Sequence, residues 1–167
     1  MSEVAIINTD CGQMVLELWR DVAPNTAGNF VQLANSGFYD GTAIHRVVRD
    51  FMIQGGDPLS KDPEQSQRWG MGNPGYTMPG EFSDRPHVRG VLSMARGNDP
   101  DSAGSQFFIC LGTAESLDGE YTCFGNLIEG DEVLGAIGAV ETERAPNMEK
   151  SRPVQRVGVE WIRVEER

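Results

Sequence analysis

The sequence predicts a mainly β fold, a closed eight-stranded antiparallel β-barrel capped by two α-helices. Eight short runs are rich in β-branched and aromatic residues, and turn residues rather than helices separate most of them. Only two segments carry apolar residues at the spacing of a helix. The 20 glycines and 9 prolines agree with a chain that turns often.

An opening hairpin is expected from strands at residues 4–7 and 14–18, because residues 9–12 between them have turn chemistry. The first helix follows, with Pro24 in its first turn, where the missing N–H of proline is tolerated. It ends before Gly37. Its apolar face consists of Ala27, Phe30, Val31 and Ala34.

The middle of the chain begins with a strand at residues 42–48, and residues 51–54 are either its continuation or its hairpin partner across a tight link at residues 49–50. The Gly-Gly pair at residues 55–56 breaks the strand, since glycine permits positive φ and close backbone approach. Residues 57–86 lose periodicity, and such long loops are usually functional. The aromatic residues in this loop suggest that it folds back on the body of the domain.

The second half of the chain alternates strands with polar turns, and one short helix precedes the last strand. The strands are expected at residues 88–95, 106–111, 122–127 and 157–164, the helix at residues 131–137, and a polar loop at residues 142–153.

Length and composition favour one domain, residues 1–167, with the size of an ordinary globular unit. The net charge of −11 argues against a nucleic-acid partner, whose phosphates an acidic surface repels. The start shows no signal peptide, and no run reaches the roughly 20 apolar residues of a membrane span. The 3 cysteines form no CxxC motif, which favours a reducing compartment and a cytoplasmic location. A monomer is the default expectation, because no apolar stretch suited to an obligate interface is evident.

Residues 45–57 hold polar and apolar groups but no set suited to proton transfer or nucleophilic attack. Arg46 and Gln54 donate hydrogen bonds without titrating near neutral pH, and Phe51 and Met52 offer only apolar contact. These groups suit a reaction in which no bond to hydrogen is broken. Taken alone, an arginine on a strand is more often a solvated charge, and a Phe-Met pair is more often core.

The two histidines are not expected to carry the chemistry. His45 is predicted to be buried and hydrogen-bonded rather than a general base. His87 stands far along the chain with no third ligand in view, so no metal site and no cofactor are expected.

Three longer segments bear a specific resemblance. HRVVRDFMIQGGD, LSMARGNDPDSAGSQFFIC and LDGEYTCFG resemble the three signature regions of the cyclophilin family of peptidyl-prolyl cis–trans isomerases. The likeness runs essentially from end to end. The loop GMGNPGYTMPGEF resembles the compact bacterial members more than the animal cytosolic ones.

The resemblance implies an enzyme that rotates X–Pro bonds in peptides and unfolded proteins without a cofactor, and so assists folding. It implies that Arg46 donates to the prolyl nitrogen, and that Gln54 holds the substrate carbonyl and orients Arg46. A proline pocket and the adjoining groove complete the implied site. Their residues are Phe51, Met52, Phe108 and Leu117 for the pocket, and Ala95, Arg96 and Gln106 for the groove.

Two positions depart from the best-known family pattern. Ser116 stands where many animal members carry a tryptophan, which the resemblance implies is a main contact for cyclosporin A. Tyr121 stands where those members have histidine, and it keeps an aromatic wall with a polar tip. Weak cyclosporin binding is therefore expected. A proline-peptide binding or chaperone module with incidental turnover is the alternative function, although pure binding would not need Arg46.

Overall fold

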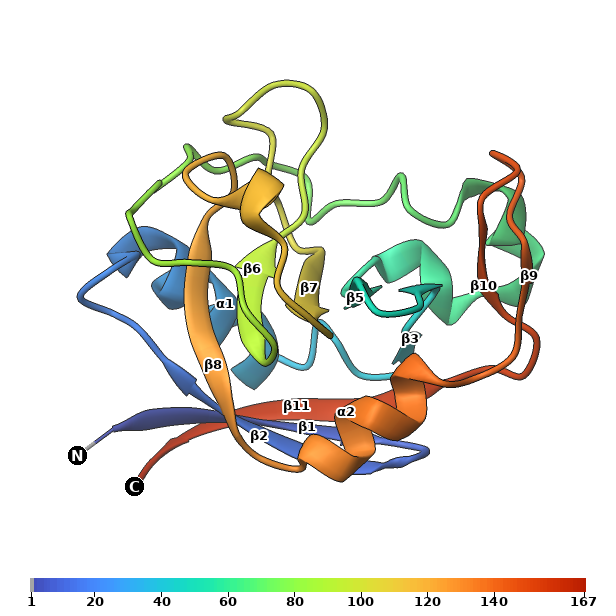
Figure 1. Cartoon of the computed structure of the whole chain (residues 1–167), viewed down its shortest axis with the longest axis horizontal. Helices are drawn as coiled ribbons and strands as arrows, with labels where there is room; N and C mark the ends of the chain where they lie inside the picture. Colours follow the sequence, from blue (N-terminus) through green and yellow to red (C-terminus); the bar gives the residue numbers. More distant parts are fainter. Residues whose placement is uncertain (1) are drawn as a thin grey trace.

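Nine strands form one curled antiparallel sheet in the computed structural model, which describes residues 2–167 (Figure 1). The sheet bends so strongly that it makes a half-barrel. In order across the sheet, the strands are β3 (Thr42–Ala43), β11 (Gly158–Glu166), β1 (Glu3–Thr9), β2 (Gly12–Leu18), β8 (Cys123–Glu129), β6 (Val91–Met94), β7 (Phe107–Cys110), β5 (Met52–Gly55) and β4 (Arg46–Val48).

The expected closed eight-stranded barrel is wrong in both strand number and closure. The predicted single strand at residues 42–48 is divided into β3, which pairs with β11, and β4, which pairs with β5. Between them the N–H of Ile44 donates to Val157 O (2.9 Å) and that of His45 donates to Gln54 O (3.1 Å). This stretch therefore crosses from one edge of the sheet to the other. No ladder joins β3 to β4 within residues 2–167.

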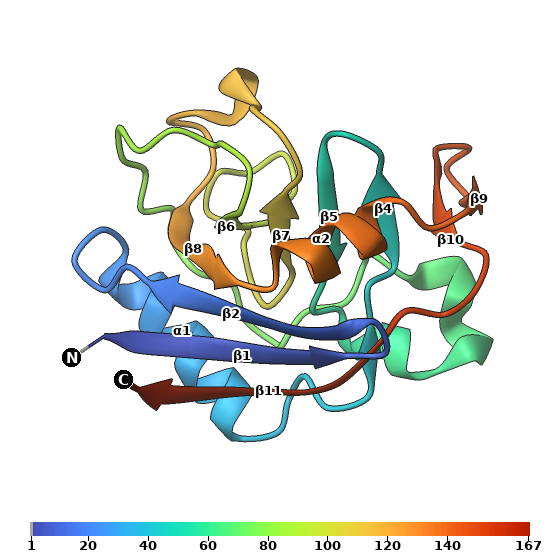
Figure 2. The same ribbon diagram turned by 60° about the horizontal axis from the view of Figure 1, so that its bottom comes forward.

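A second, two-stranded sheet lies where a polar loop was expected. Its strands are β9 (Thr142–Arg144) and β10 (Lys150–Pro153), and β10 lies against β4 (Figure 2). The strands are three and four residues long and mostly polar, so they lack the alternation that marks a strand in a sequence. This hairpin carries residues 145–149 toward β4.

The helices are close to those expected. α1 (Pro24–Asn35) begins with proline in its first turn, and α2 (Asp131–Gly138) packs against β2. The long loop after β5 also contains two short 3₁₀ helices, and a third precedes β8. These are η1 (Pro58–Lys61), η2 (Pro63–Arg68) and η3 (Glu115–Leu117). Among residues 2–167, no helix has the length and apolarity to cross a bilayer.

The loop at residues 57–86 folds back onto the body of the protein, as predicted. The residue before α1, Ala23, does not cap the helix with its side chain. The carboxylate of Glu81 in the loop accepts instead from the N–H groups of Asn25 (3.2 Å) and Thr26 (2.6 Å). A carboxylate at this end also suits the positive end of the helix dipole. Gly56, at φ 88°, makes the turn into the loop, and a Cβ there would lie 2.5 Å from Ser105 O.

The main core lies between α1 and the concave side of the sheet. Phe30 on α1 is buried at its centre, with its ring centroid 5.4 Å from Tyr39, 5.7 Å from Phe107 and 5.3 Å from Phe124. Aromatic rings at such separations add to the energy of apolar burial. α1 is thereby held against strands that are distant in sequence.

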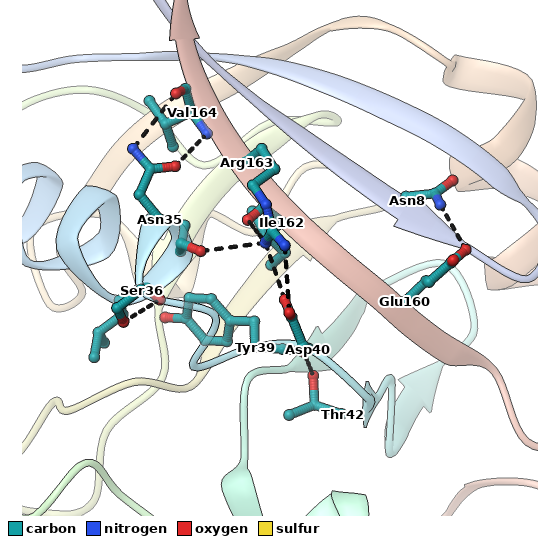
Figure 3. A network of polar contacts seen from close by, with 12 residues as sticks. Asn8, Asn35, Ser36, Tyr39, Asp40, Thr42, Glu160, Ile162, Arg163 and Val164 are labelled. Carbon is teal, nitrogen blue, oxygen red and sulfur yellow. Dashed lines mark hydrogen bonds and ion pairs between the residues drawn. The ribbon is translucent and has the colours of Figure 1, made fainter.

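The far end of α1 is tied to β11 by polar contacts (Figure 3). Asn35 accepts from the N–H of Val164 at 3.0 Å and donates to its carbonyl at 3.5 Å. Arg163 pairs with Asp40 just after the helix, at 2.9 Å. The two chain ends also meet, because Ser2 and Arg167 exchange backbone hydrogen bonds of 2.8 Å (Figure 1).

Candidate active site

A cavity of about 200 Å³ opens beside β4, β5 and β7. It brings together nine of the ten residues that the sequence singled out. They are Arg46, Phe51, Met52, Gln54, Ala95, Arg96, Phe108, Leu117 and Tyr121. The tenth, Gln106, lines a neighbouring groove of about 380 Å³ that shares Gln54, Ala95 and Arg96 with the cavity.

The apolar half of the cavity is one side of a second, smaller hydrophobic cluster. Met52 and Phe108 are buried in it, while Phe51 and Leu117 pack against it and remain half-buried. Tyr121 meets Phe108 edge to face, with ring centroids 5.9 Å apart. Side chains from three separate stretches thus form a close-packed apolar cup.

Phe108 is supported from behind by His87, which the sequence did not assign to the site. The two rings stack with centroids 6.0 Å apart. The His87 ring contacts Asp118 through Nδ1 (3.0 Å) and Ser93 through Nε2 (2.9 Å). Burial lowers the pKa of His87, so the ring is neutral at pH 7 and serves as a packing and hydrogen-bonding group.

The polar half of the site is a chain of hydrogen bonds that begins at Arg46. Arg46 and Gln54 stand directly opposite each other in the β4–β5 pair, and Nη1 donates to Oε1 of Gln54 at 2.9 Å. Gln54 Nε2 in turn donates to Oε1 of Gln106 at 2.9 Å. The series of hydrogen bonds ends where Gln106 Nε2 donates to the carbonyls of Gly70 (3.0 Å) and Gly72 (2.9 Å). Gln106 therefore positions Gln54.

Glu149, at the tip of the β9–β10 hairpin, holds the other side of the Arg46 guanidinium. Nε donates to Oε1 at 2.8 Å and Nη2 donates to Oε2 at 3.0 Å, a bidentate pair. The hydrogen bonds from Arg46 hold the pKa of Glu149 below its ordinary value of 4.5. The contacts to oxygen use three of the five N–H groups of the guanidinium, and Nη1 directs a fourth at Met52 Sδ, a weak acceptor 3.8 Å away, so one is left.

Arg96 and Tyr121 form the opposite rim of the cavity. The guanidinium of Arg96 lies 4.4 Å from the centroid of the Tyr121 ring. It donates to the carbonyl of Glu120 through Nε (2.9 Å) and Nη2 (2.7 Å). The main chain thus holds this arginine in place, unlike Arg46, which has a carboxylate partner.

A family model described as cyclophilin type peptidyl-prolyl cis-trans isomerase/CLD matches residues 4–164. The chain belongs to this family. The cyclophilin resemblance predicted from the signature segments is thereby confirmed, and the protein is an isomerase of the peptidyl-prolyl cis–trans class.

Relatives of this cyclophilin come from bacteria and eukaryotes. A peptidyl-prolyl cis-trans isomerase of Synechococcus elongatus is 44% identical over 133 residues, covering 80% of this chain and 85% of its own. Human peptidyl-prolyl cis-trans isomerase-like 1 is 39% identical over 160 residues, covering 92% of this chain and 87% of its own. A Cryptosporidium parvum cyclophilin structure superposes with a TM-score of 0.87 at 29% identity, covering 100% of this chain and 99% of that one.

Two features of this cyclophilin were not predicted from the sequence. Glu149 contacts Arg46 across 103 positions, from a segment that reads as a polar loop. His45 is buried as expected, but neither ring nitrogen makes a hydrogen bond of good geometry in residues 2–167; the backbone of Ala43 is near enough to raise the pKa of the ring, against the larger lowering by burial. His45 does not line the cavity of about 200 Å³.

Proposed function

We propose that this cyclophilin accelerates rotation about X–Pro bonds in peptides and unfolded proteins by donating a hydrogen bond from Arg46 to the prolyl nitrogen. The apolar cup of Phe51, Met52, Phe108 and Leu117 would hold the proline ring. The observation that carries the proposal is a cation on the wall of an apolar cavity, with one N–H group free among the described residues and another that faces only the weak acceptor Met52 Sδ. Residues 1–167 act as one isomerase domain in this proposal.

The barrier to rotation explains why such a site is sufficient. Amide resonance sets a barrier of about 18–20 kcal/mol, and the twisted transition state loses that resonance. The prolyl nitrogen then carries a free lone pair that can accept a hydrogen bond, whereas in the planar ground state it cannot. A donor fixed at this point stabilises the transition state more than the substrate. Gln54 would anchor the substrate carbonyl, and Ala95, Arg96 and Tyr121 would contact the preceding residues.

A proline-peptide binding or chaperone module remains the second candidate. The apolar cup would serve it equally well, but a cation held by Glu149 and Gln54 adds nothing to simple binding of a proline ring. Exchange NMR on a peptide with one X–Pro bond separates the two. An isomerase at catalytic concentration raises the rate of exchange between the cis and trans forms, which appears as broadened lines or exchange peaks between their signals. A binding module shifts signals with added protein and leaves the exchange rate unchanged, which would refute the proposal.

Replacing Glu149 with glutamine is expected to lower kcat/KM about three- to tenfold. The carboxylate fixes Nε and Nη2 of Arg46, and an amide loses one of these two acceptors. Both side chains are about one-third exposed, 34% and 33%, so solvent screening keeps the effect modest. Glu160→Gln, an acid on β11 that bonds Asn8, is the charge-matched control and should leave the rate unchanged.

The pH dependence of the Glu149 effect follows from its lowered pKa. Because the folded-state pKa lies below the ordinary 4.5, the pair contributes fully above pH 4.5 and is lost as pH falls through the folded value. The difference between the parent and Glu149→Gln should therefore be constant from about pH 5 to 8. A difference that grows or disappears inside this window would contradict the assigned role.

Cyclosporin A is expected to inhibit poorly, because Ser116 on η3 is exposed and offers no indole N–H beside Leu117. Ser116→Trp should tighten inhibition by about tenfold or more, since it adds an apolar face and a donor. Inhibition titrations with the two proteins test this. Low-nanomolar inhibition of the parent would show that Ser116 does not limit drug binding.

The oligomeric state, the location and the cellular role of the enzyme belong to the same proposal. We propose a monomeric, cytoplasmic enzyme that assists folding and is closest in pattern to compact bacterial cyclophilins. Sedimentation velocity and cell fractionation test the first two. A concentration-dependent dimer or a membrane-bound fraction would contradict them.

A further inference from the structure

Another hollow, of about 570 Å³, lies between the β9–β10 hairpin and the segment of η2. We call it the hairpin groove and define it by His45, Trp69, Glu143, Arg144, Arg152 and Arg156. In Figure 1 the β9–β10 hairpin stands beside the green ribbon of η1 and η2. The Nη1 group of Arg152 joins the two parts by donating to Ser66 O at 2.9 Å.

The hairpin groove is positively charged in a protein whose net charge is −11. Three arginines line it against one acid, Glu143. Within residues 2–167 none of the three forms an ion pair with a carboxylate. Main-chain carbonyls hold them instead, as Arg144 donates to Met148 O at 2.7 Å and Arg156 donates to Ser60 O at 2.9 Å. The charge is therefore fixed in position without being neutralised.

The hairpin groove also holds buried nitrogens without hydrogen-bond partners. In the described part of the chain these are Nδ1 and Nε2 of His45 and Nε of Arg152. Only 5% of His45 is exposed, and buried polar groups are nearly always paired. Burial lowers the pKa of His45 to about 4, so at pH 7 the neutral ring offers one N–H donor. The Arg152 guanidinium lies over the Trp69 ring, 4.8 Å from its centroid, so an aromatic side chain lies beside these donors.

A path connects the hairpin groove with the candidate active site. An intervening groove of about 550 Å³ shares His45, Trp69 and Arg152 with the hairpin groove. Its lining also includes Arg46, Gln54 and Glu149, and the carboxylate of Glu149 is paired with Arg46. Arg46 and Gln54 also line the cavity proposed to bind proline. A chain seated in that cavity can therefore continue toward the three arginines.

We propose that the hairpin groove binds the carboxylate of a glutamate or aspartate in the client polypeptide, at a set distance from the isomerised proline. A carboxylate matches this groove because it accepts from planar arginine donors and from a neutral histidine N–H. The acidic surface elsewhere would disfavour such a client, so this groove gives it a specific place to dock. The inference rests on the proposed function, since it makes the hairpin groove a specificity site for the same reaction.

The test uses the full chain and paired peptides, each with one Ala-Pro bond and with glutamate or glutamine placed in turn one to five positions from the proline on either side. Binding is followed by NMR at the Trp69 indole and the His45 ring, and turnover by exchange spectroscopy. At one or two positions the glutamate peptide should bind about tenfold more tightly than its glutamine partner. Arg152→Gln should remove this difference and leave the glutamine peptides unchanged.

Matched variants keep the result interpretable. Arg68→Gln removes an equal charge from η2 at a position that does not line the hairpin groove, and it should keep the glutamate preference. Arg144 is exposed, so Arg144→Gln is expected to fold even if Arg152→Gln does not. It should reduce the glutamate preference about threefold. An equal affinity for glutamate and glutamine at every position, or a preference that Arg152→Gln and Arg144→Gln leave intact, overturns the proposal.

Free anions are separated from peptides by titrating inorganic phosphate alone. If phosphate perturbs His45 and Trp69 in an Arg152-dependent way while the peptide pairs show no difference, the groove binds a free oxyanion and the proposal is wrong. Turnover of the glutamine peptides reports the proposed function separately. Normal acceleration without a glutamate preference overturns only the groove assignment, and absent acceleration overturns the proposed function.

Discussion

Replacing Arg46 with alanine is expected to lower kcat/KM by a hundredfold or more, which corresponds to about 2.7 kcal/mol of transition-state stabilisation. The side chain offers the cationic donor on the cavity wall, and its guanidinium is held by Glu149 at 2.8 Å and by Gln54 at 2.9 Å. The proline cup should survive the change, so peptide affinity should fall much less than the rate. Exchange NMR gives the rate, and a peptide titration gives the affinity.

Arg49→Ala is the control for the Arg46 variant. Arg49 carries the same charge, is exposed in the turn after β4 and does not line the cavity. Its loss should leave kcat/KM within a few-fold of the parent, and both variants should keep the thermal unfolding midpoint of the parent within a few degrees. Activity of Arg46→Ala close to that of Arg49→Ala would remove the proposed donor from the mechanism.

Replacing Asp57 with alanine is expected to lower the free energy of unfolding by about 2–4 kcal/mol. Asp57 is fully buried, and its two carboxylate oxygens accept from the N–H groups of Leu59 (2.8 Å) and Gly70. Alanine leaves both donors without their acceptor, and because Leu59 is half-buried and Gly70 is exposed, each loss lies at the lower end of about 1–3 kcal/mol. Urea unfolding measures the loss.

Asp57→Ala should also slow catalysis, because Gly70 is one of the two residues whose carbonyls hold Gln106 and hence Gln54. The matched variant is Asp62→Ala, which removes the acceptor for Glu64 N–H at 2.9 Å from an exposed 3₁₀ turn. A helix-cap loss of this kind costs about 1 kcal/mol and lies away from the hydrogen-bond chain. If Asp57→Ala and Asp62→Ala had the same free energy of unfolding, the hydrogen bonds of buried Asp57 would not be what holds the loop at residues 57–86.

The site residues that could be predicted lie where the local sequence pattern and the family signature segments agree. Arg46 and Gln54 stand on either side of a tight turn, so antiparallel pairing alone puts them opposite each other. Phe108 and Leu117 join them from later signature segments. Both helices also followed from their apolar spacing.

The parts that could not be predicted depend on contacts without a local signal. The crossing of residues 44–45 between two sheet edges turns one predicted strand into two. The β9–β10 hairpin is polar and short, so its pairing is visible only in three dimensions. Glu149 reaches Arg46 through that hairpin, and the missing partners of His45 are a property of the folded groove.

The pairing of β1 with β11 has a consequence for biosynthesis. β1 precedes β11 by most of the described chain, so its outer neighbour is completed only at Glu166, the partner of Glu3. At about 5–20 residues per second, translation from Glu3 to Glu166 occupies on the order of 10–30 s. Throughout that interval the nascent hairpin β1–β2 presents an unpaired edge, a state prone to association with other strands. β1 of this isomerase thus gains its second neighbour in the sheet only after β11 has left the ribosome.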